Sequence, residues 1–162
     1  MVAVGAAATF VVLSRPSAST VDVKEETVSN DRIARGALGC IALFMTLTAL
    51  QAAFFPRSFF DEFPLGRGWV AAEGGNYDEH LVRDVGVLFL ALIIVTVWSA
   101  WTGNGVVAVA IAWLVQGVLH LWYHVGHLDG LDGLDRVGLV ASLAAVPLLA
   151  LVALIASRTR SS

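Results

Sequence analysis

Four long apolar stretches constrain the fold of this chain more than any other feature. They cover residues 33–55, 81–101, 105–125 and 137–156. A helix needs roughly 20 apolar residues to cross the hydrocarbon core of a bilayer, and each stretch supplies such a length. A membrane β-barrel would instead show segments of alternating polarity, about 10 residues each. The sequence therefore predicts an all-α fold, a bundle of four transmembrane helices.

The composition agrees with a membrane location. Of the 162 residues, 57% are hydrophobic and only 14% are charged, whereas soluble domains carry about 25% charged residues. The net charge of −3 offers no basic face for nucleic acid. We expect a multi-pass protein of the cell (plasma) membrane, surrounded by the lipid bilayer, with homo-oligomers or a larger membrane complex left open. The single cysteine, Cys40, lies in an apolar run and is interpreted as a small core residue.

The N-terminal segment differs from the four spans. Its first 13 residues are apolar and the following stretch is rich in Ser, Thr and Glu. Thirteen residues are too few to cross a bilayer, and the basic start of a signal peptide is missing. We therefore expect a flexible N-terminal tail over residues 1–30, a transmembrane domain over 31–157, and a C-terminal tail over 158–162.

Lysine and arginine near the helix ends set the expected orientation, because cytoplasmic loops carry an excess of these residues. With both termini inside, the inner side holds Lys24, Arg32, Arg35, Arg158 and Arg160. The outer side then holds Arg57, Arg67, Arg83 and Arg136. The margin is small, and it favours cytoplasmic N- and C-termini. The aromatic segment 56–70 is then expected to lie along the outer membrane interface.

Four residues carry further structural expectations. Gly36, Gly39 and Gly86 mark points where two helices can approach closely, since glycine has no side chain to separate the backbones. Asp135 precedes the last apolar stretch by two residues. Because aspartate favours the first positions of helices, we expect it to help cap that helix.

Polar residues gather at two points of the apolar pattern. All four histidines lie in residues 76–84 and 120–128, which two antiparallel helices would bring to one membrane face. Spacings of three and four residues place side chains on one helix face. Such spacing puts Gln116 and three histidines on one stripe, and pairs His80 with Asp84 and Glu79 with Arg83. The expected polar cluster, built between the second and third helices, contains Glu79, His80, Arg83, Asp84, Gln116, His127 and Asp129.

Three interpretations of this cluster remain open. Ion pairs between His80 and Asp84 and between Arg83 and Glu79 can form a structural network that locks the second helix to the third. Imidazole and carboxylate groups can instead bind a transition metal, zinc or iron. The candidate metal ligands are His80, His120, His124, His127 and Asp84. The cluster can also handle protons or a small ligand. The sequence contains no GxSxG, P-loop or CxxC motif, so motifs assign no enzymatic activity.

The chain resembles a group of bacterial four-helix integral membrane proteins without assigned chemistry. The resemblance rests on FPRSFFDEFP at 55–64, NYDEHLVRDVG at 76–86 and HLWYHVGHLDGL at 120–131, and it covers residues 33–155. The group is similar to DoxX-like proteins in architecture only, and none of the residues associated with DoxX-like sulfur oxidation is found here. The resemblance implies a four-helix membrane bundle and no particular activity.

Overall fold

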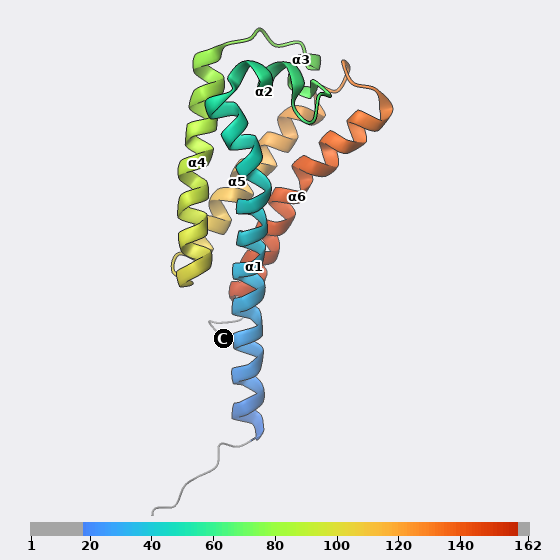
Figure 1. Cartoon of the computed structure of the whole chain (residues 1–162). Coiled ribbons are helices and arrows are strands. Elements are labelled where there is room, and N and C mark those ends of the chain that lie inside the picture. Colours follow the sequence, from blue (N-terminus) through green and yellow to red (C-terminus); the bar gives the residue numbers. More distant parts are fainter. Residues whose placement is uncertain (1–17, 159–162) are drawn as a thin grey trace, which may run out of the picture.

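The computed structural model describes residues 18–158 and consists of helices joined by short connections (Figure 1). The helices are α1 Ala18–Phe54, α2 Pro56–Glu62, α3 Trp69–Ala72, α4 Glu79–Thr102, α5 Val106–Val125 and α6 Gly133–Arg158. Four of them, α1, α4, α5 and α6, are long and apolar enough to cross a membrane. No strand occurs within residues 18–158. Within these residues the predicted all-α fold with four helices of membrane-spanning length and composition is confirmed, and these helices indicate a multi-pass membrane protein.

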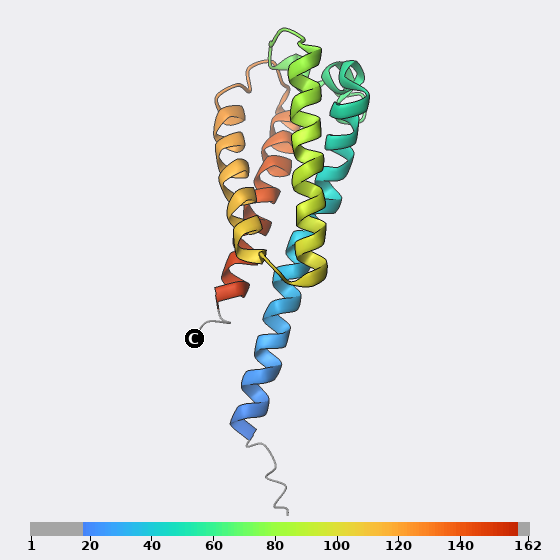
Figure 2. The same ribbon diagram turned by 90° about the vertical axis from the view of Figure 1, so that its left-hand side faces the viewer.

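The first helix is longer than the sequence pattern indicated. It begins at Ala18, so residues 18–30, which were expected to belong to a flexible tail, are helical. The remainder of the expected tail, residues 1–17, lies outside the described residues, as do residues 159–162. No Gly or Pro interrupts residues 18–31, and extending an existing helix costs far less than nucleating one. The start of α1 projects beyond the rest of the bundle (Figures 1 and 2).

Aspartates define the beginnings of α4 and α6. The Asp78 carboxylate accepts a hydrogen bond from the backbone N–H of Leu81 at 3.1 Å, which satisfies one free donor of the first turn. Asp132 does the same for the N–H of Asp135 at 2.9 Å. The helix begins at Gly133, and Asp132 directly before it is the N-cap. The expectation that Asp135 caps α6 was therefore wrong.

α1 is the central helix of the bundle. It packs along α4 on one side and along α6 on the other, and α5 packs along α6. α4 and α5 are joined by a tight turn in which Gly103 has a left-handed φ of 77°. From this turn the two helices diverge towards their other ends (Figures 1 and 2). They therefore do not form the closely packed pair that the polar pattern of the sequence suggested.

A buried tryptophan fills the space between the diverging helices α4 and α5. Trp113 is completely buried, and its ring stacks on Phe89 with centroids 6.1 Å apart. Its indole N–H donates to the hydroxyl oxygen of Thr96 at 2.8 Å, and that hydroxyl donates to the carbonyl of Leu92. Every polar atom of this contact thus has a partner, as burial in an apolar core requires.

Two glycines allow neighbouring backbones to touch. A Cβ atom at Gly86 of α4 would overlap the backbone of Ala52 and Ala53 in α1. A Cβ atom at Gly117 of α5 would lie 2.7 Å from the ring of Pro147 in α6. Small residues at helix interfaces are the usual means of close packing in membranes. The predicted close approach at Gly86 is confirmed.

Three expectations for α1 were wrong. Gly36 and Gly39 face open space, with no atom within 4 Å of the position that a Cβ would take. Cys40 is exposed and does not belong to the core. The buried face of α1 instead includes Leu38 and Ile41, both fully buried. Because successive helical positions differ by about 100°, residues adjacent to a buried position can point to the surrounding lipid.

We predict that Gly86→Ala destabilises the bundle by about 1–3 kcal/mol, because the added methyl group would force α4 away from α1. The matched control is Gly36→Ala, which adds the same methyl group to open space and raises helix propensity by up to about 1 kcal/mol. Thermal unfolding in detergent, followed by circular dichroism, measures both. Equal unfolding temperatures for the two variants would contradict the close contact.

Candidate functional site

The segment between α1 and α4, residues 55–78, forms a cap over one end of the bundle. It contains α2 and α3, and it lies near the last turn of α5 and the first turn of α6 (Figure 1). α2 contacts the end of α1 and the beginning of α4, and α3 packs on α2. The polar residues at this end of α5 and α6 are therefore close enough to form contacts with the cap.

Asp135 of α6 connects the bundle to the middle of the cap. Its carboxylate accepts hydrogen bonds from the guanidinium of Arg67 and from the indole N–H of Trp69 at 2.8 Å. The hydrogen bond to Asp135 raises the pKa of Arg67 above its ordinary value. The Trp69 ring itself is buried against Leu131 and Leu139. Polar and apolar contacts thus hold the start of α3 on α6.

Glu73 connects the end of the cap to α5. This residue directly follows α3, and its carboxylate accepts a hydrogen bond from Nδ1 of His124 at 2.5 Å. The two side chains are only 10% and 16% exposed. Beside them, Gly130 lets the carbonyl of Ala72 approach so closely that any Cβ there would overlap it. The end of α3 is therefore held against both α5 and the loop that follows it.

The histidine stripe of α5 divides into different environments. His120 is half-buried, and its ring lies 4.4 Å from that of His124 in an edge-to-face arrangement. Within residues 18–158 the His120 side chain has no hydrogen-bond partner. His127 is exposed, stacks on the ring of Tyr123, and bonds through Nδ1 to the Tyr123 carbonyl at 2.8 Å. Only His120 and His124 are thus neighbours within the bundle.

The polar residues at the start of α4 form a separate group. His80 lies 3.4 Å from Asp84 on an exposed face, with the His80 side chain 88% exposed. Arg83 pairs with Glu79 at 2.8 Å, so both expected pairs are present. Arg83 also donates to the carbonyl of Ala53 at 2.8 Å. This group therefore connects α4 to α1 and not to α5, because α4 and α5 diverge towards this end.

The proposed metal ligands consequently lie in separate groups. His80 and Asp84 contact each other on α4, and His120, His124 and His127 follow α5 towards its end. Among the described residues, no three His, Cys, Asp or Glu side chains are arranged to hold a metal ion. The remaining members of the expected cluster, Gln116 and Asp129, form no side-chain hydrogen bond or ion pair within residues 18–158. The single pocket expected between the second and third spans is thus replaced by two groups, each attached to a different neighbour.

Sequence reasoning missed the residues that join the cap to the bundle, namely Arg67 and Glu73 of the cap and Asp135 of α6. It counted Arg67 only as a charge of the outer side, it did not single out Glu73, and it assigned Asp135 to a helix cap. One signal was available for Glu73, which follows the short apolar run WVAA and is the only acidic residue between Glu62 and Asp78. Identifying His124 as the partner of Glu73 requires knowledge of the path that the cap takes over the bundle.

Comparison with protein-family models, with curated proteins and with solved structures finds no match to this chain. The resemblance to bacterial four-helix membrane proteins therefore stays a prediction.

Proposed function

We propose that the protein is a membrane protein whose polar residues serve to fasten an extracellular cap to a four-helix bundle. One observation carries this proposal. Residues of the cap form hydrogen bonds with two different helices. Glu73 is bonded to His124 of α5, and Arg67 and Trp69 are bonded to Asp135 of α6. Partly buried charged groups need partners within the protein. The carboxylates of Glu73 and Asp135 find theirs across this junction.

We propose further that both termini face the cytoplasm of the plasma membrane and that the cap lies outside. The lysines and arginines of the N- and C-terminal ends support this orientation under the positive-inside rule. At the cap end, arginines form ion pairs within the protein. Three of the four arginines at the cap end are paired, in the pairs Arg57–Asp61, Arg67–Asp135 and Arg83–Glu79.

The orientation predicts opposite labelling of two engineered cysteines in a Cys40→Ala background. Gly75→Cys lies in the cap, where the glycine is exposed with open space around it. Asn104→Cys lies at an exposed position of the α4–α5 turn. A membrane-impermeant maleimide added to intact cells should label Gly75→Cys, and it should label Asn104→Cys only after lysis. The reverse pattern would place the cap in the cytoplasm and overturn the proposed orientation.

A second candidate function is the binding of a small polar ligand beside α5. It is favoured by His120, whose half-buried imidazole has no hydrogen-bond partner among the described residues and lies beside the His124–Glu73 pair. Polar groups within a membrane helix are costly and often functional. The metal hypothesis and the role as a subunit of a larger membrane complex stay predictions.

The structural role predicts that His124→Ala lowers the free energy of unfolding by about 1–3 kcal/mol, because Glu73 is left partly buried without its partner. His80→Ala is the matched control, since loss of an exposed ion pair costs about 0–1 kcal/mol. Thermal unfolding in detergent measures both, and elemental mass spectrometry of the same samples measures zinc and iron. We expect no near-stoichiometric metal in the parent. A bound metal that disappears from a folded His120→Ala/His124→Ala variant would instead establish the metal site.

A further inference from the structure

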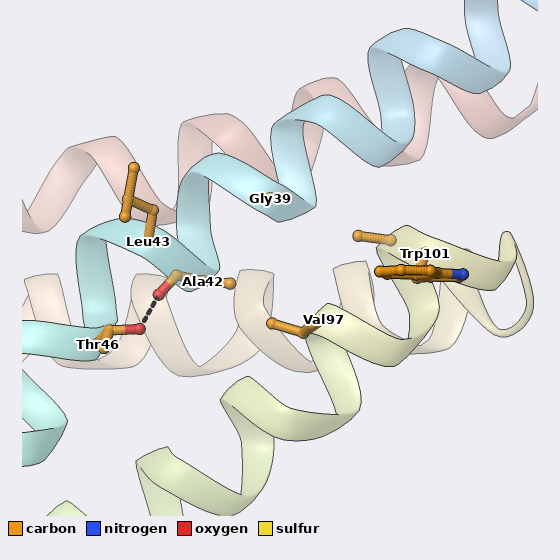
Figure 3. Close-up of a pocket in the computed structure, with 7 residues that line it drawn as sticks. Gly39, Ala42, Leu43, Thr46, Val97 and Trp101 are labelled. Atoms are coloured by element: carbon orange, nitrogen blue, oxygen red, sulfur yellow. Dashed lines mark hydrogen bonds between the residues drawn. The ribbon is translucent and has the colours of Figure 1, made fainter.

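A groove lies between α1 and α4, away from the cap and close to the α4–α5 turn. It has a volume of about 410 Å³ and is open to the surroundings of the bundle. Figure 3 shows the two helices on either side, with side chains of both turned towards the space. The residues that line it include Gly39, Ala42 and Thr46 of α1 and Val97, Ala100 and Trp101 of α4.

The surface of this groove is apolar. The only hydroxyl group among its lining residues belongs to Thr46, and it donates to the carbonyl of Ala42 at 2.6 Å within the same helix (Figure 3). A hydrogen bond of this kind leaves no donor for an occupant of the groove. Gly39 has no atom near the position of a Cβ, so the hollow at this point is unfilled. The groove therefore suits a hydrocarbon chain.

A cationic group stands where the groove ends. Arg35, one helical turn before Gly39, donates through Nε to the carbonyl of Ala100 at 2.6 Å and through Nη2 to that of Trp101. These two bonds use two of the five N–H donors of a guanidinium, so three remain for an anion. Arg32 lies one turn earlier and is also exposed. The groove thus has apolar walls and a positively charged end.

The rim of the groove disfavours a second helix. Close pairs of membrane helices approach each other through small residues. Here Leu43 and Trp101 stand at the groove with exposed fractions of 79% and 80%. A flexible hydrocarbon chain can pass between such side chains, whereas a rigid helix would be held away from Gly39. An exposed tryptophan ring also prefers the level of the lipid headgroups.

We propose that this groove binds one anionic phospholipid, with an acyl chain along α1 and α4 and the phosphate against Arg35 and Arg32. Basic pockets between membrane helices are known to recognise anionic headgroups. The site depends on the membrane location of the bundle and not on the orientation or role proposed for the cap. It lies at the opposite end of α4 from His80 and Asp84.

Native mass spectrometry of the full chain in detergent, with phosphatidylglycerol and phosphatidylcholine added in equal amounts, tests this proposal. The parent should retain one phosphatidylglycerol under activation that removes phosphatidylcholine. Gly39→Leu fills the groove and should lower the retained fraction about fivefold, which corresponds to roughly 1 kcal/mol. Gly36→Leu is the matched control, because its side chain also enters open space on α1 but does not line the groove. It should bind as the parent does.

The headgroup contact is tested with Arg32→Gln. The Arg32 side chain is exposed and forms no hydrogen bond or ion pair with the described residues, so it can be changed without loss of packing. It should reduce the preference for phosphatidylglycerol over phosphatidylcholine, whereas Arg158→Gln on α6 should not. Arg35→Gln should abolish the preference for phosphatidylglycerol if this variant stays folded. If Arg35→Gln does not fold, the result for Arg32→Gln decides whether the headgroup contact exists. Equal retention by Gly39→Leu and Gly36→Leu, or equal retention of both lipids by the parent, would overturn the proposal. A dimer that Gly39→Leu abolishes would make a second copy the occupant and would overturn it as well.

Discussion

Contact between helix backbones is the interaction on which the rest of this structure depends. Lipid tails are as apolar as the side chains of the spans, so burial of apolar surface alone does not hold membrane helices together. Here the missing side chain of Gly86 lets α4 reach the backbone of α1 at Ala53, and that of Gly117 lets α5 reach Pro147. These contacts fix α4 on one side of the bundle and the α5–α6 pair on the other.

The polar architecture follows from that arrangement. Because α4 and α5 separate towards the cap, their polar residues cannot meet, and each group binds what lies closest. Arg83 reaches the carbonyl of Ala53 at the end of α1, and His124 reaches Glu73 of the cap. Asp135 accepts hydrogen bonds from Arg67 and Trp69 of the cap. Attachment of the cap to α5 thus explains part of the histidine-rich sequence. Among the described residues, His120 is the one imidazole of α5 that forms no hydrogen bond.

The sequence predicted what depends on local pattern and failed where the path of the chain decides. Span length gave the four helices, and the 3.6-residue repeat gave the Arg83–Glu79 and His80–Asp84 pairs. The close contact at Gly86 was predicted correctly, but the same reasoning failed for Gly39, because the inward face of α1 is set by its neighbours. The Glu73–His124 pair joins residues 51 positions apart. It follows from the route of the cap, which no local pattern encodes.

The most direct test of this account is a double-mutant cycle on the pair that fastens the cap to α5. Free energies of unfolding would be measured for the parent, Glu73→Ala, His124→Ala and the double variant in the same detergent. If the two side chains bond directly, their effects should be coupled by about 0.5–3 kcal/mol, as is usual for residues in contact. Effects that add to within about 0.5 kcal/mol, as for independent sites, would show that Glu73 and His124 do not hold the cap.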